Sequence, residues 1–371
     1  MMKEIRLILL AGALLLAGAP LLLMTTAGFC QSDMNITEQD LARFRESPME
    51  FFFEMESGSA IRAAEILLQE KDLHNGERKD ILTTMGMIYL AEGHPRAARA
   101  SFMECITQDP QAELTGAAKL PPPVVNLFYS LRDSIVLARR IERPLQLNTL
   151  AIGDIENNSI IPGPFDLDKF AKGLVHIITT DLSGIDNLTL VDRQRLDVLR
   201  REIEMNNNDA IFDPEKRVAF GKLTGAGSFL FGSLMMAEKN NLRIDLRLVE
   251  TETGEILLAE SVDGKAKSGS DLIKLEQKLV VDILAPKIKD LLGGGPEDWD
   301  KNLKNQIRRR EDEKYLVMVL ATGRAVLAEE AGDLAAAATA WAEVVALDPR
   351  NEQAAGRTRS LAAYAAYTSK E

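Results

Sequence analysis

The segment LVDRQRLDVLRREIEMN, residues 190–206, concentrates charge where a predicted strand turns into a predicted helix. Asp192 and Arg193 form an adjacent acid–base pair there, and such a pair in a cleft would suit proton transfer or anion recognition. A helix start gives the same residues a structural role, because Asp192 can accept hydrogen bonds from the first backbone N–H groups. The arginines that follow alternate with acids, as on a solvated helix face. We therefore interpret the pair as structural.

Other residues with catalytic or ligating chemistry are scattered along the chain. The stretch FGKLTGAG, residues 220–227, lacks the order of a phosphate-binding loop, because Leu223 follows Lys222 where Ser or Thr is required. The three histidines, His74, His94 and His176, fall in separate segments, so they do not predict a metal site. We expect no catalytic residue, no cofactor and no metal. A hydrolase that uses unrecognised carboxylates stays open as an alternative.

The composition is that of a folded protein with an acidic surface. The chain has 371 residues, enough for two or three domains, and 46% of them are apolar. Its net charge of -12 argues against nucleic acid as a partner, since affinity for a phosphate backbone rises with the number of cationic contacts. No small-molecule substrate is evident from the sequence. Only two cysteines are present, which excludes a disulfide framework.

The first thirty residues have the order of a secretory signal peptide. Lys3 and Arg6 precede an apolar run, residues 7–24, and small residues follow it. We expect residues 1–30 to be removed and the protein to be exported to the periplasm, with attachment to the outer membrane left open. A retained anchor is one alternative. Lipidation at Cys30 is another, although Phe29 stands where a lipobox has a small residue.

Residues 40–116 show the spacing of tetratricopeptide (TPR) helical hairpins. Gly86 and Tyr89 fit the first helix of a repeat, and Ala98, Phe102 and Pro110 fit the second. Small residues at such positions let two helices approach closely, while aromatic rings fill the space between their turns. The preceding residues 52–68 fit a degenerate first repeat.

The C-terminal residues 301–371 repeat this pattern. Ala337, Trp341 and Pro349 have the same mutual spacing as their N-terminal counterparts, and one more helix is predicted after them. A single helical hairpin cannot bury its own apolar face. We therefore expect both helical regions to pack on the central domain.

The middle of the chain, residues 145–292, alternates strand and helix patterns. A connecting helix at residues 121–143 precedes it, with Arg132 expected on the outside, and a linker at residues 293–300 follows it. The predicted order is β-α-β-α-α-β-β-β-α, with antiparallel hairpins at Asn240 and Gly254. This order describes an α+β fold: one mixed sheet with covering helices, flanked by all-α hairpins.

The central region resembles the CsgG-like family, whose type member is the curli production assembly/transport component and whose fold is similar to the N-terminal domain of TolB. The resemblance lies in Asp192-Arg193, in Gly232-Ser233 and in the hairpin at Thr253-Gly254. It implies the mixed sheet and carries no catalytic motif. Channel members of that family have long inserted hairpins that alternate apolar and polar residues, whereas the hairpin loops here are short.

These features together predict a non-enzymatic protein of the bacterial cell envelope. We expect it to act as an assembly or interaction adaptor whose partners are other envelope proteins or further copies of itself. The alternative is an outer-membrane secretion or assembly component of a curli-like export system.

Overall fold

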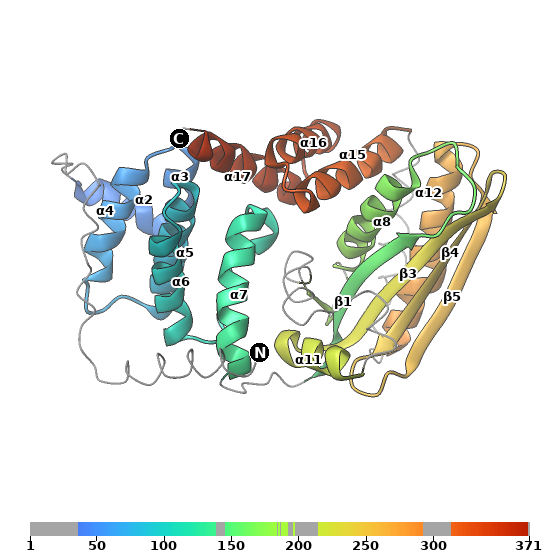
Figure 1. Cartoon of the computed structure of the whole chain (residues 1–371), viewed down its shortest axis with the longest axis horizontal. Helices are drawn as coiled ribbons and strands as arrows, with labels where there is room; N and C mark the ends of the chain where they lie inside the picture. The colour runs from blue at the N-terminus through green and yellow to red at the C-terminus, as the bar shows by residue number, and fades with distance from the viewer. Residues whose placement is uncertain are drawn as a thin grey trace, which may run out of the picture. The chain divides into compact units, whose positions relative to one another are not determined.

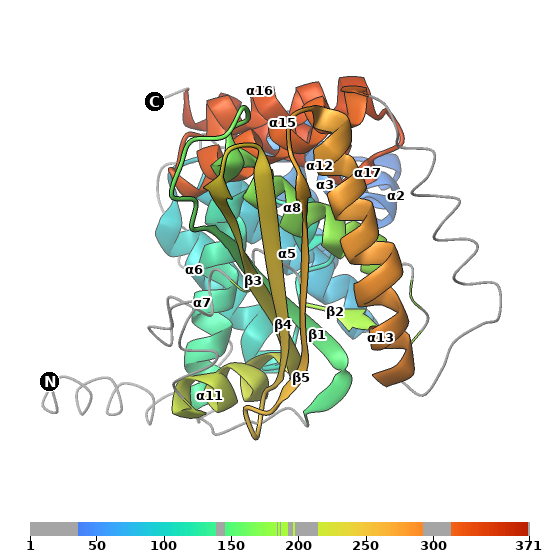
Figure 2. The same ribbon diagram turned by 90° about the vertical axis from the view of Figure 1, so that its right-hand side faces the viewer.

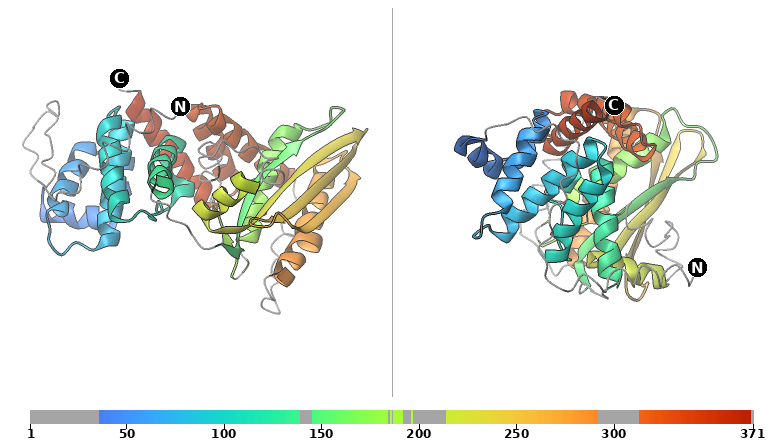
Figure 3. Two further views of the ribbon diagram at one scale, coloured as in Figure 1. Left: turned by 60° about the horizontal axis from the view of Figure 1, so that its bottom comes forward. Right: turned by 60° about the vertical axis from the view of Figure 1, so that its left-hand side comes forward.

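The computed structural model describes residues 36–138, 145–183, 185, 187–191, 196, 214–291 and 313–369. These residues contain one five-stranded mixed sheet with the strand order β2-β1-β3-β4-β5 (Figure 1). Strand β1, Gln146–Asn157, runs parallel to β2, Thr189–Leu190, and to β3, Ala226–Glu238. The antiparallel strands β4, Asn241–Glu250, and β5, Ile256–Lys265, complete the sheet. Strands β3 to β5, coloured yellow to orange, lie side by side in Figure 3.

The sequence of β4 shows why the sheet has two unlike faces. Successive side chains of a strand point to opposite faces, and β4 alternates leucine or isoleucine with charged residues. Leu242, Ile244, Leu246 and Leu248 are all buried. Their face is covered by α8, Leu167–Leu182, and by one continuous helical stretch (Figure 2). This stretch consists of α12, Gly269–Gln277, the π-helical segment η2, Lys278–Leu284, and α13, Ala285–Leu291. We call this side of the sheet the covered face.

Among the described residues, one apolar cluster covers part of the opposite face. Helix α11, Pro214–Thr224, packs Phe220 against Phe229 of β3, with ring centroids 5.1 Å apart. Val249 of β4 and Val136 of α7, Pro122–Ala138, belong to the same apolar cluster. The cluster ends at Phe231, and the strands continue beyond it without an apolar cover among the described residues.

The N-terminal region is helical. Its helices are α2, Glu38–Glu46; α3, Pro48–Phe53; α4, Ser57–Leu68; α5, Asn75–Ala91; α6, Pro95–Gln108; the 3-10 turn η1, Ala117–Lys119; and α7, Pro122–Ala138. Helices α5 and α6 form the predicted hairpin around Gly86, where a Cβ atom would lie 2.2 Å from the Phe102 ring. Glycine is therefore required for this close approach.

The C-terminal region contains α15, Glu313–Glu330; α16, Leu334–Leu347; and α17, Glu352–Thr368. Helix α15 packs tightly on α8 because glycines stand at the crossing. A Cβ atom on Gly173 would lie 2.3 Å from the Val319 carbonyl oxygen, and one on Gly323 would lie 1.9 Å from that of Lys169. The prediction that the C-terminal helices pack on the central domain is confirmed.

The N-terminal helices have a contact that the sequence did not predict. Tyr367 of α17 stacks on Phe52 of α3, with centroids 5.1 Å apart, and Arg359 forms an ion pair with Glu50 at 2.9 Å. The guanidinium of Arg357 also donates to the Leu120 carbonyl oxygen. Helix α17 therefore joins the two helical regions to each other, a contact additional to the expected packing on the central domain.

Candidate interaction surface

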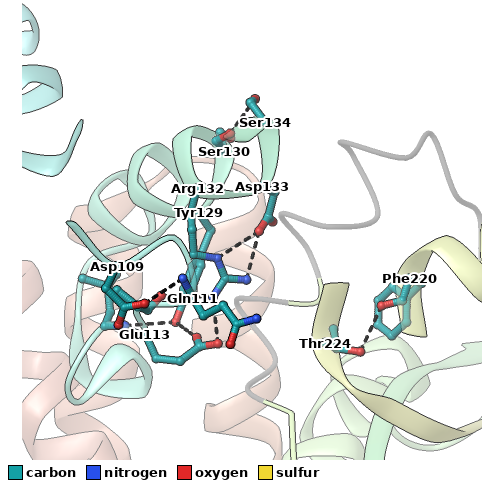
Figure 4. A network of polar contacts seen from close by, with 12 residues as sticks. Asp109, Gln111, Glu113, Tyr129, Ser130, Arg132, Asp133, Ser134, Phe220 and Thr224 are labelled. Carbon is teal, nitrogen blue, oxygen red and sulfur yellow. Dashed lines mark hydrogen bonds and ion pairs between the residues drawn. The ribbon is translucent and has the colours of Figure 1, made fainter. Parts of the chain in front are cut away.

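Arg132 of α7 lies in a buried polar network that sequence analysis missed. Arg132 and Asp133 are 1% and 0% exposed. Arg132 donates to Asp133 Oδ1 from Nε at 3.1 Å and from Nη2 at 2.9 Å, and its Nη1 donates to the Ala112 carbonyl oxygen at 3.1 Å and to Glu113 Oε1 at 2.7 Å (Figure 4). The prediction that Arg132 faces outward is wrong. A guanidinium can be buried where its donors meet acceptors and a counter-charge, as they do here.

Tyr129 completes this network one helical turn before Arg132. Its hydroxyl donates to Glu113 Oε2 at 2.8 Å and accepts from the Leu114 backbone N–H at 3.3 Å. The Arg132 guanidinium lies 4.9 Å from the centroid of the Tyr129 ring. Burial, reinforced by the Glu113 carboxylate, raises the pKa of Tyr129, so the hydroxyl keeps its proton. The network fastens α7 to the loop before it and thereby fixes the helix that brings Val136 to the sheet.

Thr253 and Gly254 form the turn between β4 and β5. Gly254 has φ +79°, a conformation that favours glycine, and the Thr253 hydroxyl accepts from the Glu255 N–H at 3.0 Å. Arg217 of α11 is buried and donates from Nε to the Thr251 carbonyl oxygen at 2.8 Å. A Cβ atom on Gly254 would lie 2.6 Å from Arg217 Nη2, so the turn is shaped to receive this side chain. The geometry gives these residues a packing role.

Gly232 and Ser233 lie in the middle of β3. Gly232 pairs with Leu246, and a Cβ atom on it would lie 2.2 Å from the Asp245 carbonyl oxygen. Ser233 is half-buried opposite Asp245. Asp192 and Arg193 lie outside the described residues, and their predicted role at a helix start stays a prediction.

The residues predicted to pack the helical hairpins lie within or beside them. Ala98, Phe102, Ala337 and Trp341 are buried. Tyr89 and Pro110 are half-buried, and Pro349 is exposed in the loop after α16. Trp341 also donates from Nε1 to Glu329 Oε1 at 2.8 Å, which ties α16 to α15.

The three histidines are not brought together. His74 and His94 precede α5 and α6, and His176 lies in α8 beside Trp341, with ring centroids 5.6 Å apart. Within the described ranges, no three residues among His, Cys, Asp and Glu are grouped so that they could hold a metal ion. A search of the same residues for membrane-spanning helices finds none of sufficient length and apolarity.

Beyond the apolar cluster that ends at Phe231, the described part of the sheet presents a polar surface. We call it the open sheet face. It consists of side chains from three adjacent strands that point away from the covered face: Ser233 and Met235 of β3, Arg243, Asp245 and Arg247 of β4, and Ala259, Ser261 and Asp263 of β5. Each of them is exposed or half-buried.

The charges on the open sheet face are unevenly paired. Arg243 donates from Nη2 to Asp245 Oδ1 at 2.8 Å and stands opposite Asp263 of β5. The hydrogen bond to Asp245, its charge and that of Asp263 raise the pKa of Arg243. Arg247 is exposed opposite Phe231 and Ala259, and no ion pair joins it to any carboxylate in the described part of the chain. Among the described residues, Arg247 is thus the arginine of this face that has no ion pair.

The comparisons with known proteins bear on this part of the molecule. A model of the family described as peptidoglycan-synthase activator LpoB matches residues 126–263. The match begins within α7, includes Arg132, and ends within β5, so it contains the whole open sheet face. It covers less than half of the chain. The helical regions on either side lie largely outside it.

Solved structures of similar proteins cover the same share of the chain. The LpoB C-terminal domain from Salmonella enterica is 17% identical over 36% of this chain and 95% of its own, with a TM-score of 0.27. The LpoB C-terminal domain from Escherichia coli is 17% identical over 40% and 98%, also with 0.27. Lipoprotein GNA1162 from Neisseria meningitidis is 18% identical over 37% and 96%, with 0.29. No curated protein matches the chain. TM-scores this low do not define a common fold.

The resemblance to the CsgG-like family is wrong, because the family model that matches the central region is that of LpoB. The residues that suggested it explain the error. Gly232-Ser233 and Thr253-Gly254 serve strand pairing and a tight turn, which many antiparallel hairpins require. The alternative of a curli-like secretion component was based on that resemblance and is not supported either. The TPR repeats are not shown either: the helical hairpins are present, but the comparisons do not show that repeat family.

Proposed function

We propose that this chain is an exported, non-enzymatic adaptor that binds a peptidoglycan synthase in the cell envelope and activates it. The observation that supports this most is the match to the peptidoglycan-synthase activator model over residues 126–263. An activator of this kind acts by binding its enzyme, so it needs an accessible and rigid surface. The matched residues include such a surface, the open sheet face, on strands that are hydrogen-bonded to their neighbours.

The predicted signal peptide at residues 1–30 supports a periplasmic location, where peptidoglycan synthases are accessible. Whether Cys30 is removed with the signal peptide, lipidated or retained determines how the mature chain is attached to the membrane. Mass spectrometry of the mature N-terminus separates signal cleavage, lipidation of Cys30 and retention of the segment. A retained, unmodified segment in the cytosolic fraction would contradict the proposed location.

The flanking helical regions are proposed to hold the activator domain at a defined position relative to other envelope proteins. The α8–α15 crossing supports this role, because the glycines at Gly173 and Gly323 let the two helices pack backbone to backbone. A homo-oligomer stays a prediction, which light scattering on the purified chain tests through its molar mass.

The direct test of the proposed function measures binding and enzyme rate together. Purified mature chain is added to a purified peptidoglycan synthase from the same organism, and glycan polymerisation from a lipid-linked precursor is followed. The expected result is a saturable rise in polymerisation rate, with a midpoint that agrees with the dissociation constant measured by calorimetry. A chain that neither binds the synthase nor changes its rate would contradict the proposal.

A further inference from the structure

We infer that the open sheet face is the surface that contacts the synthase, and that Arg247 is its main charged contact, pairing with a carboxylate on the partner protein. This inference rests on the proposed function and deepens it. The contact lies in the matched residues 126–263, on an element whose position is fixed by the fold.

The backbone around Arg247 is held on both sides. Strand β4 pairs with β3 through Phe231 and with β5 through Ala259 at this position. The neighbours along the strand, Leu246 and Leu248, are buried in the covered face at 1% and 2% exposure. A side chain on such a strand loses little backbone entropy on binding, because its backbone is already ordered.

The pairing of charges singles out Arg247. Arg243 is held by Asp245 at 2.8 Å and faces Asp263, so its charge is already compensated within the face. Arg247 lacks such a partner among the described residues, and its neighbour across β5, Ala259, is small. A partner carboxylate could therefore approach the guanidinium closely and accept two hydrogen bonds from it.

The surrounding acids indicate what kind of anion fits. Asp263 lies on the same face and would repel a densely charged phosphate surface, such as a membrane rich in anionic lipid. A protein surface can offer one carboxylate to Arg247 and a cationic group to Asp263. The mixed charges of the open sheet face therefore favour a protein partner with a complementary mixture.

The test compares three forms of the full mature chain: wild type, Arg247→Glu and the control Arg99→Glu. Arg99 is an exposed arginine of α6 that lies outside the matched residues and makes no ion pair within the described ranges. The dissociation constant for the synthase is measured by calorimetry at fixed ionic strength, and melting temperatures verify that all three forms are folded. We expect Arg247→Glu to weaken binding by at least about tenfold, as for an arginine that carries much of an interface's binding energy, and Arg99→Glu to change it by less than about twofold.

The outcomes separate the inference from the function on which it rests. Wild-type activation with an unchanged affinity for Arg247→Glu would overturn the inference and leave the proposed function standing. A wild-type chain that does not bind the synthase would overturn both. In a second arm, vesicles of phosphatidylglycerol replace the synthase. Loss of vesicle binding in Arg247→Glu with unchanged synthase affinity would overturn the inference in favour of a lipid surface.

Discussion

Two arginines within the same matched region are used in opposite ways. Arg132 of α7 is 1% exposed and donates to Asp133, Glu113 and a backbone carbonyl oxygen. Arg247 of β4 is exposed and has no ion pair in the part of the chain that the structure describes. The Arg132 guanidinium is buried and hydrogen-bonded, and it fixes a helix to the loop before it. The Arg247 guanidinium is exposed, and we propose that it binds a partner protein.

The contrast separates residues that maintain the fold from residues that recognise a partner. Substitution of Arg132 should lower stability and affect binding only through unfolding. Substitution of Arg247 should leave stability almost unchanged and affect binding directly. The same separation applies to adjacent residues of β4, because Leu246 points to the covered face and Arg247 to the open one.

The largest loss of stability is expected for Arg132→Met. This change leaves the carboxylate of Asp133 buried without the guanidinium, and breaking a buried ion pair costs about 3–5 kcal/mol. Urea denaturation measures the loss. The double variant Arg132→Met/Asp133→Asn should recover part of it, because the buried charge that faced the guanidinium is removed. A single variant as stable as wild type would show that the network does not fasten α7.

A loss of about 2–5 kcal/mol is expected for Leu246→Ala, because the change removes a fully buried side chain of the covered face and leaves a cavity. Urea denaturation measures this loss. The slope of the unfolding free energy against urea concentration should stay unchanged. An effect below about 1 kcal/mol would mean that the covered face is loosely packed at this strand.

Gly173→Val tests the crossing between α8 and α15, with an expected loss of about 1–3 kcal/mol from overpacking. The added side chain would collide with the backbone carbonyl of Val319, which cannot move without separating the helices. Gly76→Ala is the matched control. Gly76 lies in α5, nothing stands within 4 Å of a Cβ atom there, and the change should be neutral or slightly stabilising. Equal effects in both variants would contradict the tight crossing.

The smallest effect on stability is expected for Arg247→Ala, within about 0.5 kcal/mol of wild type, as for an exposed residue that makes no buried contact. Thermal and urea denaturation both measure it. A loss comparable to that of Arg132→Met would place Arg247 among the residues that maintain the fold and would remove the distinction between the two arginines.

Local patterns predicted much of the sheet. The alternation LRIDLRLVE in β4 assigns its leucines to one face and its charges to the other, and the turns at Asn240 and Gly254 have the positive φ that their residue types favour. Helix α8 also begins where Asp166 predicts it, since that side chain accepts from the Lys169 N–H at 3.1 Å.

The contacts between distant segments could not be predicted in this way. Helical periodicity assigns a charged residue such as Arg132 to the surface. Two of its acceptors, on Ala112 and Glu113, lie about twenty residues earlier, in a loop whose path has no sequence signal. The stacking of Tyr367 on Phe52 joins opposite ends of the chain. The assignment to a family failed for a related reason, because turn and pairing residues report local geometry and are shared by unrelated sheets.

The most direct measurement is the rate of glycan polymerisation by the synthase as increasing amounts of the mature chain are added, for wild type and for Arg247→Glu. We expect the polymerisation rate to rise and saturate with the wild-type chain. With Arg247→Glu we expect the same plateau, reached at concentrations at least about tenfold higher. A synthase rate that does not respond to the wild-type chain would contradict the proposed function, and coincident curves would contradict the role of the open sheet face.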